Sequence, residues 1–95
     1  MTEPHEIPID GELDLHTFHP REVGALVPEY INECRRRGIL QVRIIHGKGS
    51  GTLRRSVHSI LDRMPEVLSY RHEHAGGGWG ATVVRIFPLS GAVKT

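Results

Sequence analysis

Two segments with helical spacing of apolar residues alternate with short segments rich in Val and Ile, and this alternation constrains the fold most. The first helical segment begins at Pro20, which suits a first helical position, and stops at Gly38. The second begins near Thr52, where Thr52 or Ser50 offers an N-cap oxygen, and runs to Met64. Strand-type segments cover residues 13–16, 40–46, 67–71 and 81–87. The predicted order is therefore βαβαββ.

Strand–helix–strand units favour parallel strands joined by right-handed crossovers. The last two strands are joined by a loop of about eight residues, which is too short for a helical crossover, so we expect this pair to be antiparallel. The pattern predicts a two-layer α/β sandwich, with a four-stranded mixed sheet and two helices on one face. Pro28 interrupts the first helical segment, but the apolar stripe continues, so we expect one kinked helix. The predicted domain covers residues 7–88, between flexible tails at 1–6 and 89–95.

The composition fits one small soluble domain. With 95 residues, of which 38% are hydrophobic, the chain is long enough for one core. Cys34 is the only cysteine, which excludes a disulfide within the chain and a cysteine-based zinc site, and fits the reducing cytoplasm. The acidic N-terminus does not resemble a signal peptide, and no run approaches the roughly 20 apolar residues that span a bilayer. We therefore expect a cytoplasmic protein without a membrane partner.

The charges are unevenly distributed, although the net charge is only +1. Residues 1–34 hold eight acids and one base, whereas residues 35–55 hold seven bases and no acid. Such a block can form a local positive surface that attracts nucleic acid. The alternative is two solvated faces of opposite sign that attract each other.

The loop after the second predicted strand has the composition of a phosphate site. It consists of His46, Gly47, Lys48, Gly49, Ser50 and Gly51. Glycines let backbone N–H groups approach a ligand, and the lysine and a helix N-terminus add positive charge, so we expect this loop and Arg54 to hold a phosphate. A tight turn that simply needs glycine is the alternative. The sequence matches neither a Walker A motif nor a dinucleotide fingerprint, so a nucleotide cofactor is not expected.

Asp14 and His16 end the first predicted strand, and His46 ends the second. A carboxylate beside an imidazole can orient the ring and support its cationic form, which suits general acid–base catalysis near neutral pH. We take Asp14, His16 and His46 as candidate catalytic residues. Together they offer oxygen and nitrogen donors for a metal, but no metal site is assigned. The alternative is structural: Asp14 caps a turn and His16 bonds only the backbone. The remaining histidines show no spacing that predicts a site.

A second glycine-rich loop carries the only tryptophan. The indole of Trp79 either stacks on an unpaired base or folds back on the core as a lid. We include Gly77, Gly78 and Trp79 among the candidate nucleic-acid-binding residues. If the third strand runs parallel to the first two, this loop lies at the same edge of the sheet as Asp14, His16 and the first glycine loop.

Three motifs, in this order, resemble the small MutS-related (Smr) domain family. Leu13–His16 is similar to the family's L-D-L-H-G, His46–Gly51 to its H-G-x-G-x-G, and Gly77–Val83 to its G-G-x-G-x-T. The resemblance covers nearly the whole chain, from about Leu13 to Phe87. It implies a fold like the C-terminal domain of bacterial translation initiation factor three. It also implies binding to DNA or RNA, nicking endonuclease activity as in several members, and a role in DNA repair or recombination.

The resemblance attaches cleavage to the L-D-x-H motif, here Asp14 and His16, and nucleic-acid contact to the glycine loop. One departure concerns the glycine that follows L-D-L-H in the family, which is Thr17 here. Threonine resists both positive φ and close approach to a phosphate. The departure therefore weighs against catalysis more than against binding.

Three functions fit these residues. In the first, the chain is an endonuclease in which His16 is general base or acid, Asp14 orients it, and Lys48 with the loop amides holds the scissile phosphate. In the second, the same residues form a non-catalytic module that recognises DNA or RNA structure. In the third, the chain is a protein-interaction domain with a decayed site, which Thr17 favours. The sequence leaves open a divalent cation such as Mg2+, DNA against RNA, and the oligomeric state.

Overall fold

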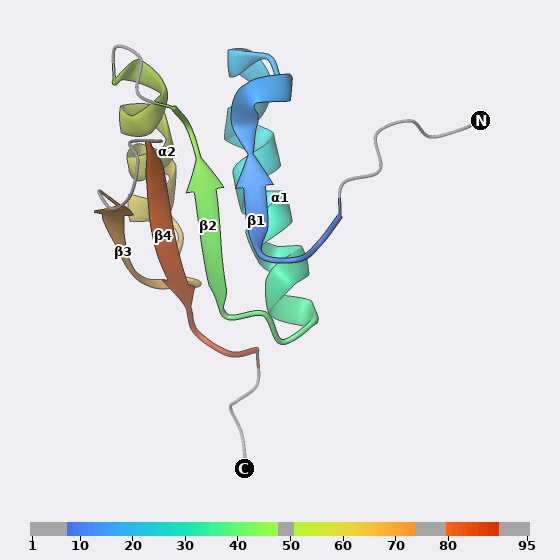
Figure 1. Ribbon diagram of the computed structural model, residues 1–95. Helices are drawn as coiled ribbons and strands as arrows, with labels where there is room; N and C mark the ends of the chain where they lie inside the picture. Colours follow the sequence, from blue (N-terminus) through green and yellow to red (C-terminus); the bar gives the residue numbers. More distant parts are fainter. Residues whose placement is uncertain (1–7, 48–50, 74–79, 90–95) are drawn as a thin grey trace, which may run out of the picture.

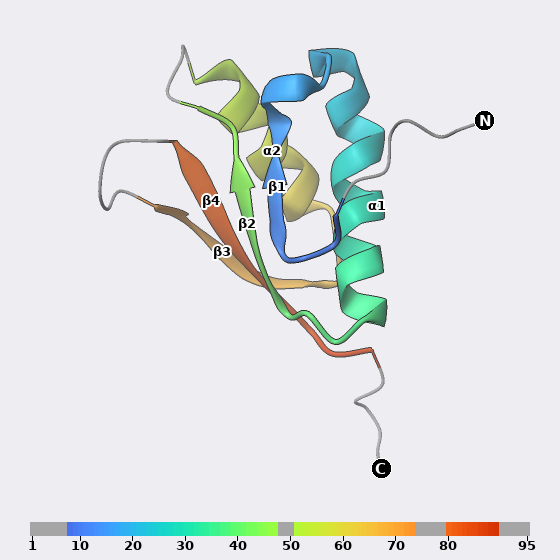
Figure 2. The same ribbon diagram turned by 45° about the vertical axis from the view of Figure 1, so that its right-hand side comes forward.

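The computed structural model describes residues 8–47, 51–73 and 80–89, which form two layers (Figure 1). One layer is a four-stranded sheet of β1 (Glu12–Asp14), β2 (Gln41–Ile45), β3 (Val67–Glu73) and β4 (Ala81–Ile86). The other consists of helices α1 (Val23–Arg36) and α2 (Thr52–Asp62). Two short 3-10 helices lie between β1 and α1: η1 (Leu15–Thr17) and η2 (Pro20–Glu22). The turned view shows both helices on the same face of the sheet, so the predicted sandwich is confirmed (Figure 2).

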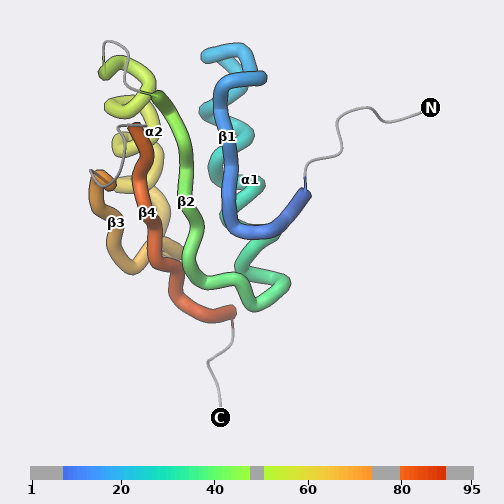
Figure 3. The backbone as a smooth tube through the Cα atoms, in the orientation of Figure 1, coloured from blue at the N-terminus to red at the C-terminus, as the bar shows by residue number. Residues whose placement is uncertain are grey.

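The sheet is mixed, with the strand order β1-β2-β4-β3. β1 and β2 are parallel, and β4 is antiparallel to both of its neighbours, which makes β3 parallel to β1 and β2. At one edge, Asp14 lies opposite Ile45, Ile45 opposite Ala81, and Ala81 opposite Glu73. The carboxyl ends of three strands and the start of β4 therefore meet at this edge, which is uppermost in the tube view (Figure 3).

The first strand is shorter than predicted. The sequence pattern predicts a strand over residues 13–16, but β1 ends at Asp14 and the 3-10 helix η1 begins at Leu15. The cause is local: the Asp14 carboxylate accepts the backbone N–H of His16 at 2.9 Å and caps the turn. The strand prediction is therefore wrong for Leu15 and His16, although Leu15 is still buried in the core.

The first predicted helix begins as η2 and continues as α1. The His19 side chain accepts the N–H of Arg21, and the Glu22 side chain accepts the N–H of His19, so a capping box starts the helix with Pro20 at its first position. α1 runs through Pro28 without a break and ends before Gly38. The prediction of a single helical segment over this range is confirmed.

The second helix starts differently from the prediction. Its N-cap residue is Gly51, in a left-handed conformation at φ 90°, and no side-chain hydrogen bond caps it. Thr52 is the first helical residue, so its predicted role as N-cap is wrong, and Ser50 lies outside the described residues. A left-handed N-cap favours glycine, which has no Cβ to oppose positive φ. The glycine loop thus leads directly into the amide groups of the first turn of α2.

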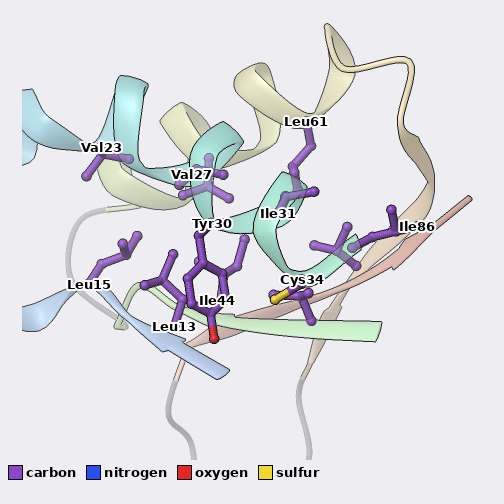
Figure 4. Packing of buried hydrophobic residues seen from close by; sticks show 13 residues of the cluster. Leu13, Leu15, Val23, Val27, Tyr30, Ile31, Cys34, Ile44, Leu61 and Ile86 are labelled. Carbon is purple, nitrogen blue, oxygen red and sulfur yellow. The ribbon is translucent and has the colours of Figure 1, made fainter. Parts of the chain in front are cut away.

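Buried side chains from both layers form one core (Figure 4). Most are aliphatic, and the fully buried Cys34 carries a free thiol. Tyr30 ties α1 to the first strand, because its hydroxyl accepts the N–H of Gly11 and donates to the carbonyl of Glu12, both at 3.1 Å. Burial raises the pKa of Tyr30 to about 12, so this joint stays uncharged. Neither helix in the described part of the chain has the length and apolar character needed to cross a bilayer.

Candidate functional site

Asp14 and His16 form a side-chain pair at the carboxyl end of β1. One carboxylate oxygen, Oδ1, lies 2.9 Å from the backbone N of His16 and 3.0 Å from its ring Nδ1. Both side chains are more than half exposed. Since a carboxylate oxygen accepts, Nδ1 carries the proton, and Nε2 is the basic nitrogen of the neutral ring. Asp14 therefore both caps the turn and orients the imidazole, so the catalytic and the structural interpretations are compatible.

Thr17 fits its position without strain. It is the last residue of η1, a right-handed 3-10 helix that any L-residue can adopt. The backbone N–H of Phe18 closes the helix on the carbonyl of Leu15 at 3.1 Å. In this chain the turn after the L-D-L-H motif therefore does not need the glycine that the family carries.

A pocket of about 280 Å³ opens beside this edge of the sheet. It lies between the end of β2, the first turn of α2 and Pro20, and its lining includes His46, Gly47, Gly51, Thr52 and Arg54. Helix N-termini present free N–H groups and partial positive charge, and Arg54 adds a full one, so the pocket suits an anion. Lys48, Gly49 and Ser50 of the predicted phosphate loop lie outside the described residues.

The start of β4 packs closely against the glycine loop. The carbonyl of Gly80 accepts the N–H groups of His46 and Gly47, at 3.0 and 2.9 Å. A Cβ on Gly80 would overlap the carbonyl of Gly47, so only glycine fits there. The two predicted loops therefore converge where Gly47 meets Gly80. Gly77, Gly78 and Trp79 lie outside the described residues.

His46 belongs to a buried network rather than to the Asp14–His16 pair. Its Nδ1 lies 3.1 Å from the Gly47 carbonyl and its Nε2 lies 2.9 Å from the Thr82 hydroxyl. A carbonyl only accepts, so Nδ1–H donates to Gly47 and Nε2 accepts from Thr82. The same hydroxyl lies 2.8 Å from Nε2 of His58, which donates to it. A directed chain of hydrogen bonds thus runs from His58 through Thr82 and His46 to the glycine loop.

The surroundings of this hydrogen-bonded network favour the uncharged form of His46 and His58. Burial lowers the pKa of His46, and the neighbouring His72, His58 and Arg54 lower it further. Burial is also the largest cause of the lowered pKa of His58, followed by Arg54 and His72. The rings of His46 and His72 are stacked, with centroids 5.9 Å apart. His46, a predicted catalytic residue, is placed to hold the glycine loop, since both of its ring nitrogens bond within the protein.

Sequence spacing did not predict this network. His72 and Thr82 are cross-strand partners on β3 and β4, and His58 approaches Thr82 from α2. These contacts arise from sheet register and helix packing, which residue spacing does not contain. The one available signal is that His58 follows Arg54 by four residues, which places both on one helical face.

The basic block at residues 35–55 does not gather at this edge. Ion pairs link several of its bases to carboxylates: Arg36 and Arg37 to Glu33, and Arg43 to Glu12 and Glu73. The Arg35 guanidinium donates to the backbone carbonyl of Phe87 at 2.9 Å. Of the described bases in this block, Arg54 lines the pocket and Arg55 lies beside it. Three of the six described bases in this block are thus paired with carboxylates, and the block does not form one continuous positive surface.

The described residues contain no group of three His, Cys, Asp or Glu side chains that could hold a metal ion. Asp14 is the one acidic member of the candidate site. Mg2+ is commonly bound through one or two carboxylates together with substrate phosphates, so the single described carboxylate would hold such a cation only beside a bound phosphate.

Comparisons with known proteins place this geometry in a family. A family model described as the Smr domain matches residues 13–86. Endonuclease MutS2 of Clostridium tetani is 38% identical over 79 residues, which cover 82% of this chain and 10% of that protein. Endonuclease MutS2 of Halothermothrix orenii is 43% identical over 76 residues, with coverages of 79% and 10%. The chain therefore spans about a tenth of the length of these relatives.

Two solved structures share the fold. The Smr domain of Thermus thermophilus MutS2 superposes with a TM-score of 0.75 at 34% identity, covering 83% of this chain and 100% of that one. YdaL, a stand-alone small MutS-related protein from Escherichia coli, has a TM-score of 0.70 at 28% identity, with coverages of 86% and 68%. The match includes both a domain within a larger protein and a separate small protein.

Proposed function

This chain belongs to the Smr domain family, and from that premise we propose that it binds nucleic acid and nicks its phosphodiester backbone. The observation that carries the proposal is the Asp14–His16 pair, held at 3.0 Å at the same sheet edge as an anion-suited pocket. The curated relatives are named endonucleases, which supports the same chemistry. We further propose a cytoplasmic setting and a role in DNA repair or recombination, with DNA or RNA as the partner.

His16 acts as the general base in this proposal. Its Nε2 takes the proton from the attacking group, which is water on DNA and either water or a neighbouring 2′-hydroxyl on RNA. As the new phosphorus–oxygen bond forms, the bond from phosphorus to the leaving sugar oxygen breaks, and that oxygen takes up a proton from solvent or from the imidazolium. Asp14 holds the Nδ1–H and stabilises the imidazolium that forms. The amide groups at the start of α2, with Arg54 and Lys48, stabilise the charge that develops on the phosphate. A divalent cation such as Mg2+ would neutralise part of the same charge.

A cleavage assay tests this proposal. Supercoiled plasmid and a structured RNA are incubated with the parent, with and without Mg2+, and with an Asp14→Ala/His16→Ala variant. We expect the parent to nick at least one substrate and the variant to nick neither. Asp14→Asn keeps the oxygen that caps η1 but removes the charge, so its loss of activity separates catalysis from folding. Arg85→Ala, on an exposed residue of β4, is the control.

A non-catalytic binding module is the second candidate. The turn accommodates Thr17, but a threonine side chain allows a phosphate to approach less closely than the family's glycine would, which favours this candidate. In that case the same edge recognises the nucleic-acid backbone without cutting it. The parent and the Asp14→Ala/His16→Ala variant would then both retard nucleic acid on a gel, and neither would cut. Binding that is unchanged between low and moderate salt would contradict both candidates, because phosphate contacts release counterions.

A further inference from the structure

A groove continues from the pocket along the helices. Its volume is about 450 Å³, and it lies between the beginning of α1 and the length of α2. Pro20, Thr52 and Ser56 line both the pocket and the groove, so the two hollows are continuous. Both helices begin at the sheet edge that carries Asp14, as the two ribbon views show (Figures 1 and 2). A nucleic-acid strand with one phosphate bound in the pocket can therefore continue along this groove.

One wall of the groove is a stripe of cations and hydroxyls on α2 and at its C-cap residue, Arg63. Its members recur at spacings of three and four residues, which places them on one helical face: Thr52, Arg55, Ser56, Ser59 and Arg63. The Arg63 guanidinium donates to the Ser59 hydroxyl at 3.2 Å, which keeps it on this face. Guanidinium and hydroxyl groups are typical donors to phosphate oxygens. The stripe thus has the composition of a nucleic-acid backbone contact.

The positive charge of this stripe is not neutralised within the described part of the chain. No carboxylate lines the groove or the pocket, and Arg55 and Arg63 form no ion pair among the described residues. Arginines elsewhere on the described surface are paired with carboxylates at two places. On the sheet, Arg43 is paired with both Glu12 and Glu73, and on α1 the two arginines near the C-terminus are paired with Glu33. Arg71 and Arg85 on the sheet also form no ion pair among the described residues, but neither lines the groove or the pocket. The helix groove is therefore a hollow with positive charge, beside the candidate site, that complements a polyanion.

The length of the arginine stripe also fits one strand of nucleic acid. Arg55 and Arg63 are eight residues apart, which is about 12 Å along a helix. One strand of B-form DNA carries a phosphate every 3.4 Å along its axis, so this length matches about three to four phosphates. The opposite wall contains Gly24, whose missing side chain leaves open space: a Cβ there would meet nothing within 4 Å.

We propose that this groove holds the sugar–phosphate backbone of one nucleic-acid strand, on one side of the phosphate held at the pocket, with Arg55 and Arg63 as its main contacts. The inference rests on the proposed nucleic-acid function and assigns a path to the strand. It predicts that affinity depends on the length of the strand beyond the cleavage site. It also makes residues outside the Asp14–His16 pair contribute to binding without contributing to chemistry.

The test measures binding against salt. Fluorescence anisotropy follows a labelled 12-nucleotide single strand, as DNA and as RNA, with the parent and with Arg55→Ala/Arg63→Ala. Each lost phosphate contact lowers the salt slope by about 0.7, so we expect a decrease of about 1.4 and a loss of affinity of about 20-fold at 0.1 M salt. The control, Arg71→Ala/Arg85→Ala, removes the same charge from exposed residues of β3 and β4, and should keep the parent's slope and affinity.

Gly24 supplies an independent variant that preserves the fold. Gly24→Ala adds a side chain without a clash in a helix, so it should fold like the parent, and it is the uncharged reference for Gly24→Glu. Gly24→Glu places a carboxylate in the groove near the start of α1, where an acid suits the helix, and should weaken binding about tenfold at 0.1 M salt.

The possible results separate the two proposals. If the parent binds and nicks while the groove variants behave like the control, the groove assignment is wrong and the proposed function stands. If the parent binds neither DNA nor RNA, both are wrong. Loss of affinity in Arg55→Ala/Arg63→Ala, with the parent's nicking rate restored at saturating protein, supports the groove as a binding surface.

Discussion

At the scale of single residues, the hydroxyl of Thr82 joins two imidazoles. It donates to Nε2 of His46 and accepts from Nε2 of His58, at 2.9 and 2.8 Å. One hydroxyl can do both only if the rings carry their protons on the nitrogens inferred above. The tautomers, the orientation of His46 and the position of the Gly47 carbonyl are therefore fixed together, which makes Thr82 the residue that supports the glycine loop.

Thr82→Val keeps the shape of the side chain and removes both hydrogen bonds. The buried Nε2 of His46 then has no donor, which costs about 1–3 kcal/mol in the free energy of unfolding. Thr17→Val makes the same exchange at an exposed position and should change stability by less than about 0.5 kcal/mol. Urea titration of both variants measures the difference. Equal stability of the two variants would show that the Thr82 hydrogen bonds contribute nothing.

The buried histidines also predict how stability depends on pH. The pKa values of His46 and His58 lie below the ordinary 6.5 in the folded chain. As the pH falls below about 6.5, the unfolded chain therefore binds more protons than the folded chain, and the free energy of unfolding decreases. We expect stability to be complete above this pH and to decline as the pH falls below it.

Denaturant titrations across that range measure the decline. His58→Gln removes one of the two groups and should make the decline shallower. A free energy of unfolding that stays level or rises as the pH falls would contradict the inferred neutral network.

The residue scale also shows what the sequence can predict of a site. Asp14 and His16 are two positions apart, so their pairing is local and was predicted from spacing. The roles of His58 and Thr82 were not predicted. These two residues meet because β4 pairs within the sheet and α2 packs on it, and spacing in the sequence does not show either contact. Polar contacts between elements depend on register and rotamers, which a single sequence does not specify.

At the scale of elements, neighbouring elements position the two described ends of the glycine loop, Gly47 and Gly51. Gly51 turns it into α2, and Gly80 at the start of β4 bonds it through Gly47. The element order and the antiparallel last pair were predictable because periodicity and loop length carry them. The end of β1 and the cap of α2 were not predictable. The first depends on the side chain of Asp14, and the second on the positive φ of Gly51. The place of β4 between β2 and β3 reflects pairing between distant segments.

Gly80→Ala tests whether this contact positions the loop. Its Cβ would overlap the Gly47 carbonyl, so we expect the backbone to shift, with a cost of about 1–3 kcal/mol and weaker nucleic-acid binding. Gly24→Ala is the matched control, because its Cβ meets nothing and alanine favours the helix. Thermal unfolding and anisotropy on both variants provide the comparison. A Gly80→Ala protein that binds like the parent would show that the contact does not position the loop.

At the scale of the whole molecule, the described arginines divide into those paired with carboxylates and those that form no ion pair among the described residues. The bases near the end of α1 face Glu33, whereas those on α2 face the groove. A run of bases in sequence therefore does not correspond to one surface, because a 14-residue helix carries part of the run away from the site. The sequence predicted nucleic acid as the partner, and the structure suggests which bases would meet it.

Arg36→Ala/Arg37→Ala tests this separation. Both guanidinium groups are paired with Glu33, and they lie at the opposite end of α1 from η2. We expect affinity for a single strand to change by less than about twofold and the salt slope to stay within about 0.3 of the parent's. Anisotropy titrations at several salt concentrations provide the values. A loss as large as that of the groove variant would mean that binding depends on total charge and not on its position.

The proposed function depends most on the imidazole of His16, which is oriented by Asp14 and activates the group that cuts the backbone held at the adjacent pocket. The most direct measurement is the initial nicking rate of His16→Ala relative to the parent, at protein concentrations that saturate the substrate. A positioned general base contributes about 100- to 10,000-fold, so we predict a loss of that size with the dissociation constant unchanged. A His16→Ala protein that nicks within about threefold of the parent would contradict the claim and assign cleavage to other groups.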